Sequence, residues 1–586
     1  MLDDFLLQVQ KPGRYIGNEW NVSRKDFHRA GIKFALCFPD LYEVGMSNLG
    51  IRILYGLLNN IPDVACERVF ACAQDLEKIL RESRREIFSL ESQIPLSAFD
   101  IVGFSLGSEL DYTNVLNILE LGNIPLEASL RDHRHPLVIG GGPCALNPEP
   151  MHEFFDLFAI GEAEDLIIEL IGAFRENKEE YKNSRISKEE LLRRLASVAG
   201  VYVPALYAVR QDDASGAIKE FRPKAGGIPS KIKKRFVPDL NASFFPTEWL
   251  VPYIQIIHDR VSLEIMRGCP NRCRFCQARS QYFPYRQRDK DNVLKIAAEV
   301  YQNSGYEEIS LAGLSVSDYP GIEQLLSGLF GLFKNKSVAV SLPSIKSTCL
   351  VGSLSRLIAQ EKKTGLTFAP EAGTAKLRDI LAKDFNEEEF FQNLAQAYLS
   401  GYQHVKLYFM LGLPFETEED LGGIIDFSLK ASRLRKEAAG RGPAQVNISV
   451  NSLIPKPHTP FQWLKAEGPD LIRKKQDYLK SKLKNKRIKA AFHDPQMSFL
   501  EGVLSRGDRC LSRVILAAFK KGARFDSWRD HFVFQRWLDA FSEAGIEPAG
   551  YLRQRHPDEF LPWDFIDCGI DKQLLVAEFK KLVADK

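Results

Sequence analysis

The stretch EIMRGCPNRCRFCQAR, residues 264–279, places three cysteines close together in the chain. Cys269, Cys273 and Cys276 follow the spacing C-x3-C-x2-C, and neither a partner Cys-x2-Cys nor a histidine pair lies nearby. Such a loop offers three metal ligands at a single place in the chain. The strands and helices predicted on either side of the cysteine loop decide where the loop lies in the fold.

The composition bounds the class of protein. The chain has 586 residues, enough for about three domains, because single hydrophobic cores stop growing near roughly 250–300 residues. Hydrophobic residues make up 45% and charged residues 26%, which is typical of a globular protein. No apolar run approaches the roughly 18 residues of a membrane span, and the acidic start MLDDFLLQVQ does not resemble a secretory signal. We therefore expect a cytoplasmic protein with no membrane contact and, with 10 cysteines in so long a chain, no disulfide framework.

The first half predicts an α/β domain. After an N-terminal segment (1–25), apolar runs that end in glycine-rich turns alternate with helical spacing over residues 26–175, as in HPLVIGGGPCA and FFDLFAIGEAEDLIIELIGAF. Strands that alternate with helices predict a doubly wound, flavodoxin/Rossmann-like parallel sheet that binds ligands at the carboxyl ends of its strands. Residues 176–255 are lysine-rich and are expected to form a connector.

A second series of six strands and helices occupies residues 256–480 and predicts a partial (β/α)6 TIM-like barrel. Its expected strands are VSLEIMR (261–267), EEISLAGLS (307–315), VAVSLPS (338–344), GLTFAPE (365–371), HVKLYFMLGLP (404–414) and QVNISVNSLIP (445–455). The cysteine loop follows the first of them, at the end of the barrel where chemistry is expected. Residues 481–586 show amphipathic helical spacing and predict a mostly helical domain packed on the barrel.

Three thiols and no fourth favour a 4Fe–4S cluster, since three cysteines can bind three irons and leave the fourth open to a substrate. Structural zinc would need a fourth protein ligand, and His258 could serve only by folding back. A zinc-stapled RNA-binding protein remains the alternative of another class, and unrelated core cysteines are a further one.

The loop resembles that of the radical S-adenosylmethionine (AdoMet) enzymes, and the resemblance extends along the chain. The motifs that carry it are PGRYIGNEW, PDLYEVGMSNLG, GFSLGSELDYTNVL, GGGPCALNPEP, RGCPNRCRFCQA, APEAGTAKLRDIL, GLPFETEEDL, PKPHTPFQW and SRGDRCLSRV. Together they resemble an uncharacterised bacterial family that joins a cobalamin (B12)-binding-like domain to a radical AdoMet domain. The resemblance implies a 4Fe–4S cluster, AdoMet as cofactor and a 5′-deoxyadenosyl radical as the reactive species.

The same resemblance implies residues that bind AdoMet. Phe275 is expected beside the adenine, although a core phenylalanine is the alternative. Gly313 and Ser315 occupy the turn after the second strand that grips the methionyl group, although AGLSVSD lacks the glutamate of the common Gly-Gly-Glu pattern. Glu371 resembles the residue that reaches the ribose or the amine, with a surface glutamate as the alternative. Separately, Thr417 is expected to cap the helix that follows GLPFE.

For cobalamin, the comparison is with the motif D-x-H-x-x-G, in which the histidine binds cobalt. Here Asp40 and Gly45 match, and Tyr42 stands in the histidine position. A neutral phenol is a poor cobalt ligand, so either cobalamin is held without that ligand or the domain keeps the fold alone. Ser105, Gly141 and Gly142 resemble the elements that line the nucleotide tail of cobalamin.

Basic residues suggest partners. The run between Arg473 and Lys489 contains nine Lys or Arg and a single acid, which is a solvated helix face or an RNA-contacting surface. Six arginines surround the cysteine loop and suit an acidic electron donor such as flavodoxin or ferredoxin, or an anionic substrate; they are Arg267, Arg272, Arg274, Arg279, Arg286 and Arg288. The sequence therefore predicts a radical AdoMet enzyme, with cobalamin-dependent methylation of an unactivated carbon as the expected reaction. Radical rearrangement, cyclisation, or modification of RNA without cobalamin are the alternatives.

Overall fold

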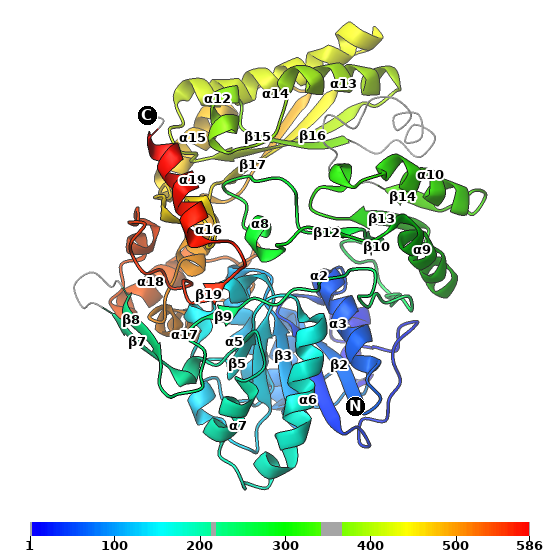
Figure 1. Cartoon of the computed structure of the whole chain (residues 1–586). Helices are drawn as coiled ribbons and strands as arrows, with labels where there is room; N and C mark the ends of the chain where they lie inside the picture. Colours follow the sequence, from blue (N-terminus) through cyan, green and yellow to red (C-terminus); the bar gives the residue numbers. More distant parts are fainter. Residues whose placement is uncertain (1–2, 212–217, 342–365, 585–586) are drawn as a thin grey trace.

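The computed structural model describes residues 3–211, 218–341 and 366–584 (Figure 1). Its N-terminal part is built on a sheet whose strands run in the order β2-β1-β3-β4-β5-β6, parallel except for β6. The strands are β1 (Ile32–Phe38), β2 (Val64–Phe70), β3 (Ile101–Ser105), β4 (Leu137–Gly141), β5 (Leu157–Ala159) and β6 (Val201–Tyr202). The strand order reverses between β1 and β3, as in a doubly wound sheet.

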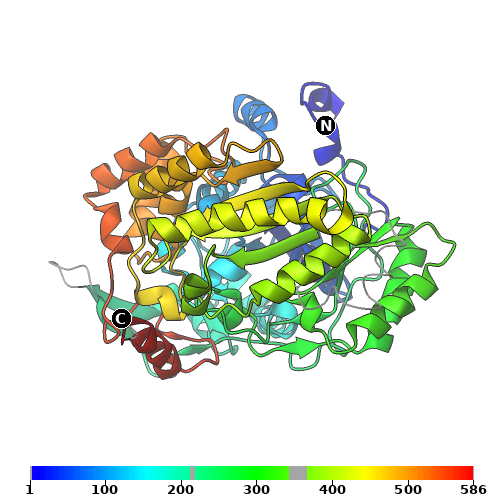
Figure 2. The ribbon, with the colours of Figure 1, turned by 90° about the horizontal axis from the view of Figure 1, so that it is seen from above.

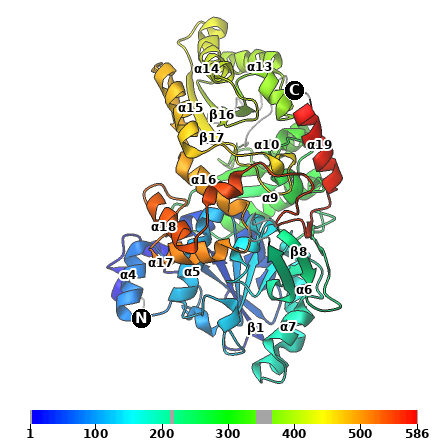
Figure 3. The same ribbon diagram turned by 90° about the vertical axis from the view of Figure 1, so that its left-hand side faces the viewer.

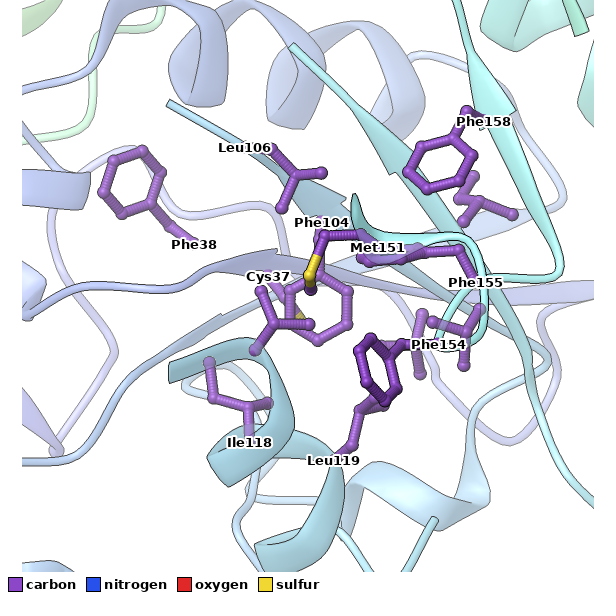
Figure 4. Close-up of a cluster of buried hydrophobic side chains, with 14 of the residues drawn as sticks. Cys37, Phe38, Phe104, Leu106, Ile118, Leu119, Met151, Phe154, Phe155 and Phe158 are labelled. Carbon is purple, nitrogen blue, oxygen red and sulfur yellow. The ribbon is translucent and has the colours of Figure 1, made fainter. Parts of the chain in front are cut away.

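Helices cover both faces of this sheet. On one face, α3 (Leu49–Asn59) contacts α6 (Ala163–Lys182), and on the other α4 (Gln74–Ser83) contacts α5 (Tyr112–Leu121) (Figure 3). Strand β1 is almost wholly buried, as its sequence IKFALCF requires for a strand covered on both faces. Beneath α5 the core is aromatic, with the rings of Phe104 and Phe155 edge to face at 5.8 Å (Figure 4).

The domain is longer than the predicted range. Helix α6 continues to Lys182, beyond residue 175, and α7 (Lys188–Leu195) and β6 also join this domain. The remaining connector contains the antiparallel pair β7 (Tyr207–Gln211) and β8 (Ile218–Pro223), and β9 (Ile232–Lys233), which pairs with β19 (Ile566–Asp567) near the other end of the chain.

The central region holds two parallel sheets, and all six expected strands occur in it, so the α/β class with parallel sheets is confirmed. The first sheet contains β10 (Val261–Glu264), β13 (Glu308–Ala312) and β14 (Ala339–Ser341). The second contains β15 (Leu366–Glu371), β16 (His404–Leu411), β17 (Gln445–Ser452) and an additional strand, β18 (Ile488–Phe492). Residues 342–344 of the third predicted strand lie outside the described residues.

Helices follow most of these strands. They are α9 (Lys290–Ser304), α10 (Ile322–Leu332), α12 (Ala375–Ile380), α13 (Glu387–Leu399), α14 (Glu418–Ala439) and α15 (Pro469–Lys482). Thr417 caps α14 in a capping box with Asp420, which confirms the predicted start of that helix. Strand β18 follows α15, so the second sheet extends past the predicted boundary at residue 480.

The sequence predicts that the helices after β18 pack on the central region, but they do not pack mainly there. Helices α16 (Pro495–Ser505), α17 (Leu511–Lys520) and α18 (Phe534–Ala544) share one hydrophobic core with the N-terminal domain, because their apolar faces meet α5 and its neighbours. Seen from above, these orange helices and the green helices of the first central sheet lie on opposite sides of the yellow helices (Figure 2). Helix α19 (Lys572–Ala584) lies against the central region, and α16 also contacts α15 of that region. Among the described residues, no helix is both long and apolar enough to span a membrane.

Candidate functional site

The cysteine loop begins where β10 passes into β11 (Met266–Arg267), and β12 (Arg286–Gln287) pairs with β11 to close it. Gly268 has a φ of +86° at the start of the loop, and a Cβ there would lie 2.7 Å from the carbonyl oxygen of Tyr282. This position therefore needs glycine. The close approach brings the two ends of the loop together.

All three cysteines are half-buried and none forms a disulfide. Burial raises the pKa of Cys273 to about 11, although the nearby Lys383 acts to lower it. Burial also raises the pKa of Cys276, and the neighbouring thiol of Cys269 adds to the effect. The thiols therefore lie near one another and need a cationic partner such as iron to become thiolates. Within the described ranges, no three Cys, His, Asp or Glu side chains are grouped to hold a single metal ion.

The turn after β13 lies against this loop. The Asn271 amide nitrogen Nδ2 lies 3.3 Å from Cys269 Sγ and 2.9 Å from Asp318 Oδ2. Ser315 donates to the same carboxylate oxygen at 2.6 Å. Gly313 packs against Met266, whose Cγ would be 2.5 Å from a Cβ at this position. The structure thus brings Ser315 to the cysteine loop through two residues that the sequence analysis did not single out, Asn271 and Asp318.

Phe275 lies in an apolar cluster. Its partly buried ring packs against a group of buried side chains that includes Ala372, Leu377, Leu381 and Leu582. This packing accounts for the side chain without a cofactor, and it leaves the backbone as the part that could meet an adenine.

Glu371 stands at the end of β15 with a φ of +67°, a conformation that costs energy in a residue other than glycine. Burial raises the pKa of its carboxyl, while Lys383, 3.3 Å away, acts in the opposite direction. Lys383 also lies near Cys273 and is a site residue that sequence reasoning missed, because no motif marks it. Strain of this kind is often found at functional sites.

The residues predicted for cobalamin fall into two groups. Ser105, Gly141 and Gly142 line one cavity of about 460 Å³. It lies on the sheet between α3 and α6, with Leu54 on one wall and Ile167 on the other. A Cβ on Gly141 would meet only Ala159, at 3.6 and 3.9 Å, so space remains beside this glycine.

The other wall of the cavity belongs to the central region. Glu264, Arg267, Gln281 and Tyr282 line it, and they flank the cysteine loop. The cavity therefore extends from the N-terminal sheet to the base of that loop.

Asp40, Tyr42 and Gly45 do not line this cavity. The buried Tyr42 hydroxyl donates to Glu19 at 2.9 Å, and Glu19 pairs with Arg68. Asp40 accepts a hydrogen bond from the indole of Trp528 at 2.9 Å. At Gly45, a Cβ would lie 2.2 Å from the ring of Phe70. Internal packing and hydrogen bonds therefore account for the whole D-x-Y-x-x-G motif.

Most of the arginines around the cysteine loop are buried and do not form a basic surface. Arg267 contacts the three carboxylates of Glu162, Glu164 and Glu264 at 2.7–3.0 Å. Arg279 forms an ion pair with Glu578, and Arg286 forms one with Glu162. Arg288 donates hydrogen bonds to backbone carbonyls. Arg274 donates to the carbonyl of Ile380, and Arg272 is exposed.

Two families match this architecture. Residues 50–204 match the family described as Radical SAM proteins, N-terminal, and residues 263–428 match the Radical SAM superfamily. The first match falls on the N-terminal sheet and its helices, and the second falls on the central region. The second includes the three cysteines, so its cofactors are a 4Fe–4S cluster and AdoMet.

Relatives cover the chain to different extents. The uncharacterized protein MJ0966 of the archaeon Methanocaldococcus jannaschii is 27% identical over 518 residues, which cover 87% of this chain and 97% of that protein. The ribosomal protein uS12 methylthiotransferase RimO of Pelotomaculum thermopropionicum is 26% identical over 212 residues, 33% of this chain and 47% of RimO. The archaeal relative does not support a family restricted to bacteria.

Two solved structures show low similarity to this chain. The radical AdoMet methyltransferase TsrM from Kitasatospora setae, with cobalamin and a [4Fe-4S] cluster bound, has a TM-score of 0.46 at 13% identity, covering 71% of this chain and 74% of TsrM. The cobalamin-dependent radical enzyme OxsB, with aqua-cobalamin and S-adenosylmethionine bound, has a TM-score of 0.46 at 12% identity. The match covers 94% of this chain and 80% of OxsB.

Proposed function

We propose that the chain is a radical AdoMet enzyme that also binds cobalamin and methylates an unactivated carbon. The observation that carries this proposal is the cavity of about 460 Å³. Ser105, Gly141 and Gly142, selected from the sequence for the tail of cobalamin, line it together. Its opposite wall holds Arg267 and Tyr282 beside the cysteine loop, so a group bound there lies between the two domains.

The cavity fits part of a large cofactor. Apolar side chains of α3 and α6 and the glycines of β4 form part of its lining, as expected for a site that accepts a flat ring. It lies next to the strand-order reversal between β1 and β3, where doubly wound sheets bind ligands. Tyr42 is committed to Glu19, so we assign it no contact with cobalt.

Each bound group has a defined part in the proposed chemistry. When bound, the cluster and AdoMet supply a 5′-deoxyadenosyl radical, and cobalamin supplies a methyl group. Cys269, Cys273 and Cys276 would hold three irons as thiolates. Glu371, fixed by its backbone and by Lys383, would accept a hydrogen bond from the ribose or the amine of AdoMet. The two central sheets would then act as one open barrel around the site.

A reducing protein such as flavodoxin or ferredoxin would supply the electron.

The substrate class could be a small metabolite or an RNA. RNA is a candidate because eight exposed cations follow one another from α15 to β18: Arg473, Lys474, Lys480, Lys482, Lys484, Lys486, Arg487 and Lys489. In the described part of the chain, only Lys480 among them forms an ion pair, with Asp477. Such a surface suits a phosphate backbone.

The test compares the native protein with Gly141→Val after anaerobic reconstitution with iron, sulfide and cobalamin. The valine should project into the cavity beside Ala159 and obstruct it, and we expect the variant to lose bound corrinoid while it keeps iron and unfolds at the native temperature. Gly172→Val is the matched control, because Gly172 lies on α6 and a Cβ added there would have nothing within 4 Å. Equal corrinoid binding in all three proteins would overturn the assignment of the cavity.

The reaction is tested with AdoMet that carries a labelled methyl group, incubated with cellular RNA or with a metabolite extract. We expect label in one of these fractions together with 5′-deoxyadenosine. Deoxyadenosine without labelled product would exclude methylation and favour a radical rearrangement or cyclisation. Labelled RNA that is unaffected by neutralising Lys484, Lys486, Arg487 and Lys489 would remove that surface from the argument.

A further inference from the structure

Helix α19 lies far from the cysteine loop in sequence but next to it in space (Figure 1). One side of the helix is apolar and packs on the central region. Leu575, Val576 and Phe579 join a buried cluster with Trp463, whose ring centroid lies 5.4 Å from that of Phe579. These contacts fix the position of the helix independently of any charge.

A second contact joins α19 to the cysteine loop itself. Leu582 is buried in the same apolar cluster against which Phe275 packs, and Phe275 stands between the second and third cysteines. One turn earlier on the helix, Glu578 faces Arg279. Arg279 donates to both oxygens of this carboxylate, at 2.9 and 2.6 Å.

Arg279 extends this contact into the loop. Its Nη1 also donates to the carbonyl oxygen of Arg272 at 3.4 Å, and its backbone N–H donates to the carbonyl of Cys276 at 3.3 Å. The guanidinium is nearly buried, so its hydrogen bonds to the carboxylate are shielded from solvent. Through its side chain and its backbone, this single residue therefore connects α19 to the segment between the first and second cysteines and to the third cysteine.

We propose that α19 clamps the cysteine loop, with Glu578 as a positioning residue that acts through Arg279. Three thiolates must be held in one arrangement to bind three irons of a cluster. The carbonyl of Arg272 is bound to a planar guanidinium, which is itself bound to a packed helix, and these contacts restrict the loop to such an arrangement. Leu582 and Phe275 close the same side against water. This inference rests on the 4Fe–4S cluster alone and not on cobalamin or methylation.

The test uses Glu578→Gln in the full chain, which keeps the shape of the side chain and removes its charge. After anaerobic reconstitution, the variant should lose its cluster absorbance several-fold faster in air than the native protein, and the electron paramagnetic resonance lines of its reduced cluster should shift. Arg279→Lys should have the same effects, since a lysine cannot bridge Glu578 and the carbonyl of Arg272. The double variant should be no worse than either single one, because both act through one contact.

Asp564→Asn is the matched control, because it breaks another ion pair of α19, that of Lys572 and Asp564 at 2.6 Å. It should change the unfolding temperature as much as Glu578→Gln and leave the cluster signals native. If Glu578→Gln retains native cluster spectra and a native bleaching rate, the clamp is refuted. If the native protein itself binds no iron and sulfide, the cluster assignment fails instead, so the two failures are distinguishable.

Discussion

At the scale of single residues, the cysteine loop separates what a sequence can predict from what it cannot. The grouping of the three thiols was predictable, because it depends on local spacing in the chain. Asn271, Asp318 and Lys383 were not, because each gains its role from a contact made across the fold. Tyr42 occupies a motif position, yet its hydroxyl is bound to Glu19 by a hydrogen bond that no local pattern indicates.

Asn271 provides the prediction at this scale. Its amide donates to Cys269 Sγ and is oriented by Asp318, and hydrogen bonds to cluster sulfurs raise the reduction potential. We expect Asn271→Leu to lower the midpoint potential of the cluster, measured by a redox titration followed by electron paramagnetic resonance. Gln277→Leu removes another amide of the same loop, one with no hydrogen bond to a cysteine in the described residues, and should leave the potential native. Equal potentials in both variants would exclude the role of Asn271.

At the scale of elements, strands were predicted where apolar residues are continuous. Strand β1 is such a run and is buried on both faces. Strand β18 was missed because only Ile488 of its five residues is fully buried and it lies in a lysine-rich stretch that suggested a helix or a surface. The position of α17 on α5 was also missed, because an amphipathic helix indicates that it packs but not on which partner.

The contact of the C-terminal helices with α5 predicts a pH dependence. Asp526 is buried and accepts a hydrogen bond from Thr113 on α5, and burial raises its pKa to about 6. An unfolded aspartate has a pKa of about 3.9. Below about pH 4 the carboxyl is protonated in both states, so stability is lost as the pH rises toward 6 and the unfolded chain releases its proton first.

We therefore expect Asp526→Asn to become progressively more stable than the native protein between pH 4 and pH 6, by up to about 3 kcal/mol. Urea unfolding at several pH values measures this difference. Asp539→Asn, at an exposed position on α18, is the control and should show no such trend. A constant difference between Asp526→Asn and the native protein across this range would contradict the prediction.

At the scale of the whole molecule, the interface between the domains was the least predictable part. Three of the six arginines that suggested a docking surface, Arg267, Arg279 and Arg286, are instead held in ion pairs with little exposure, since a sequence shows the charge of a residue but not its burial. Arg267 and Arg286 come from the central region and meet Glu162, which stands just before α6 of the N-terminal domain. These contacts lie beside the cavity between the domains, because Glu162 and Arg267 both line it.

Glu162→Gln tests whether this cluster holds the two domains together. Both oxygens of the carboxylate accept hydrogen bonds from Arg286, and one also accepts from Arg267, with side-chain exposure of 6%. Removing the charge takes the carboxylate of Glu162 from Arg286, while Arg267 keeps Glu164 and Glu264. Breaking a buried pair in this way costs about 3–5 kcal/mol. We expect calorimetry to show one unfolding transition for the native protein and two for the variant, because the domains lose their coupling. Glu169→Gln is the control, because it breaks the ion pair of Glu169 with Arg235, in which the glutamate side chain is 49% exposed. It should lower the free energy of unfolding by at most about 1 kcal/mol. A loss of similar size in both variants would show that the Glu162 cluster contributes no more than a surface ion pair.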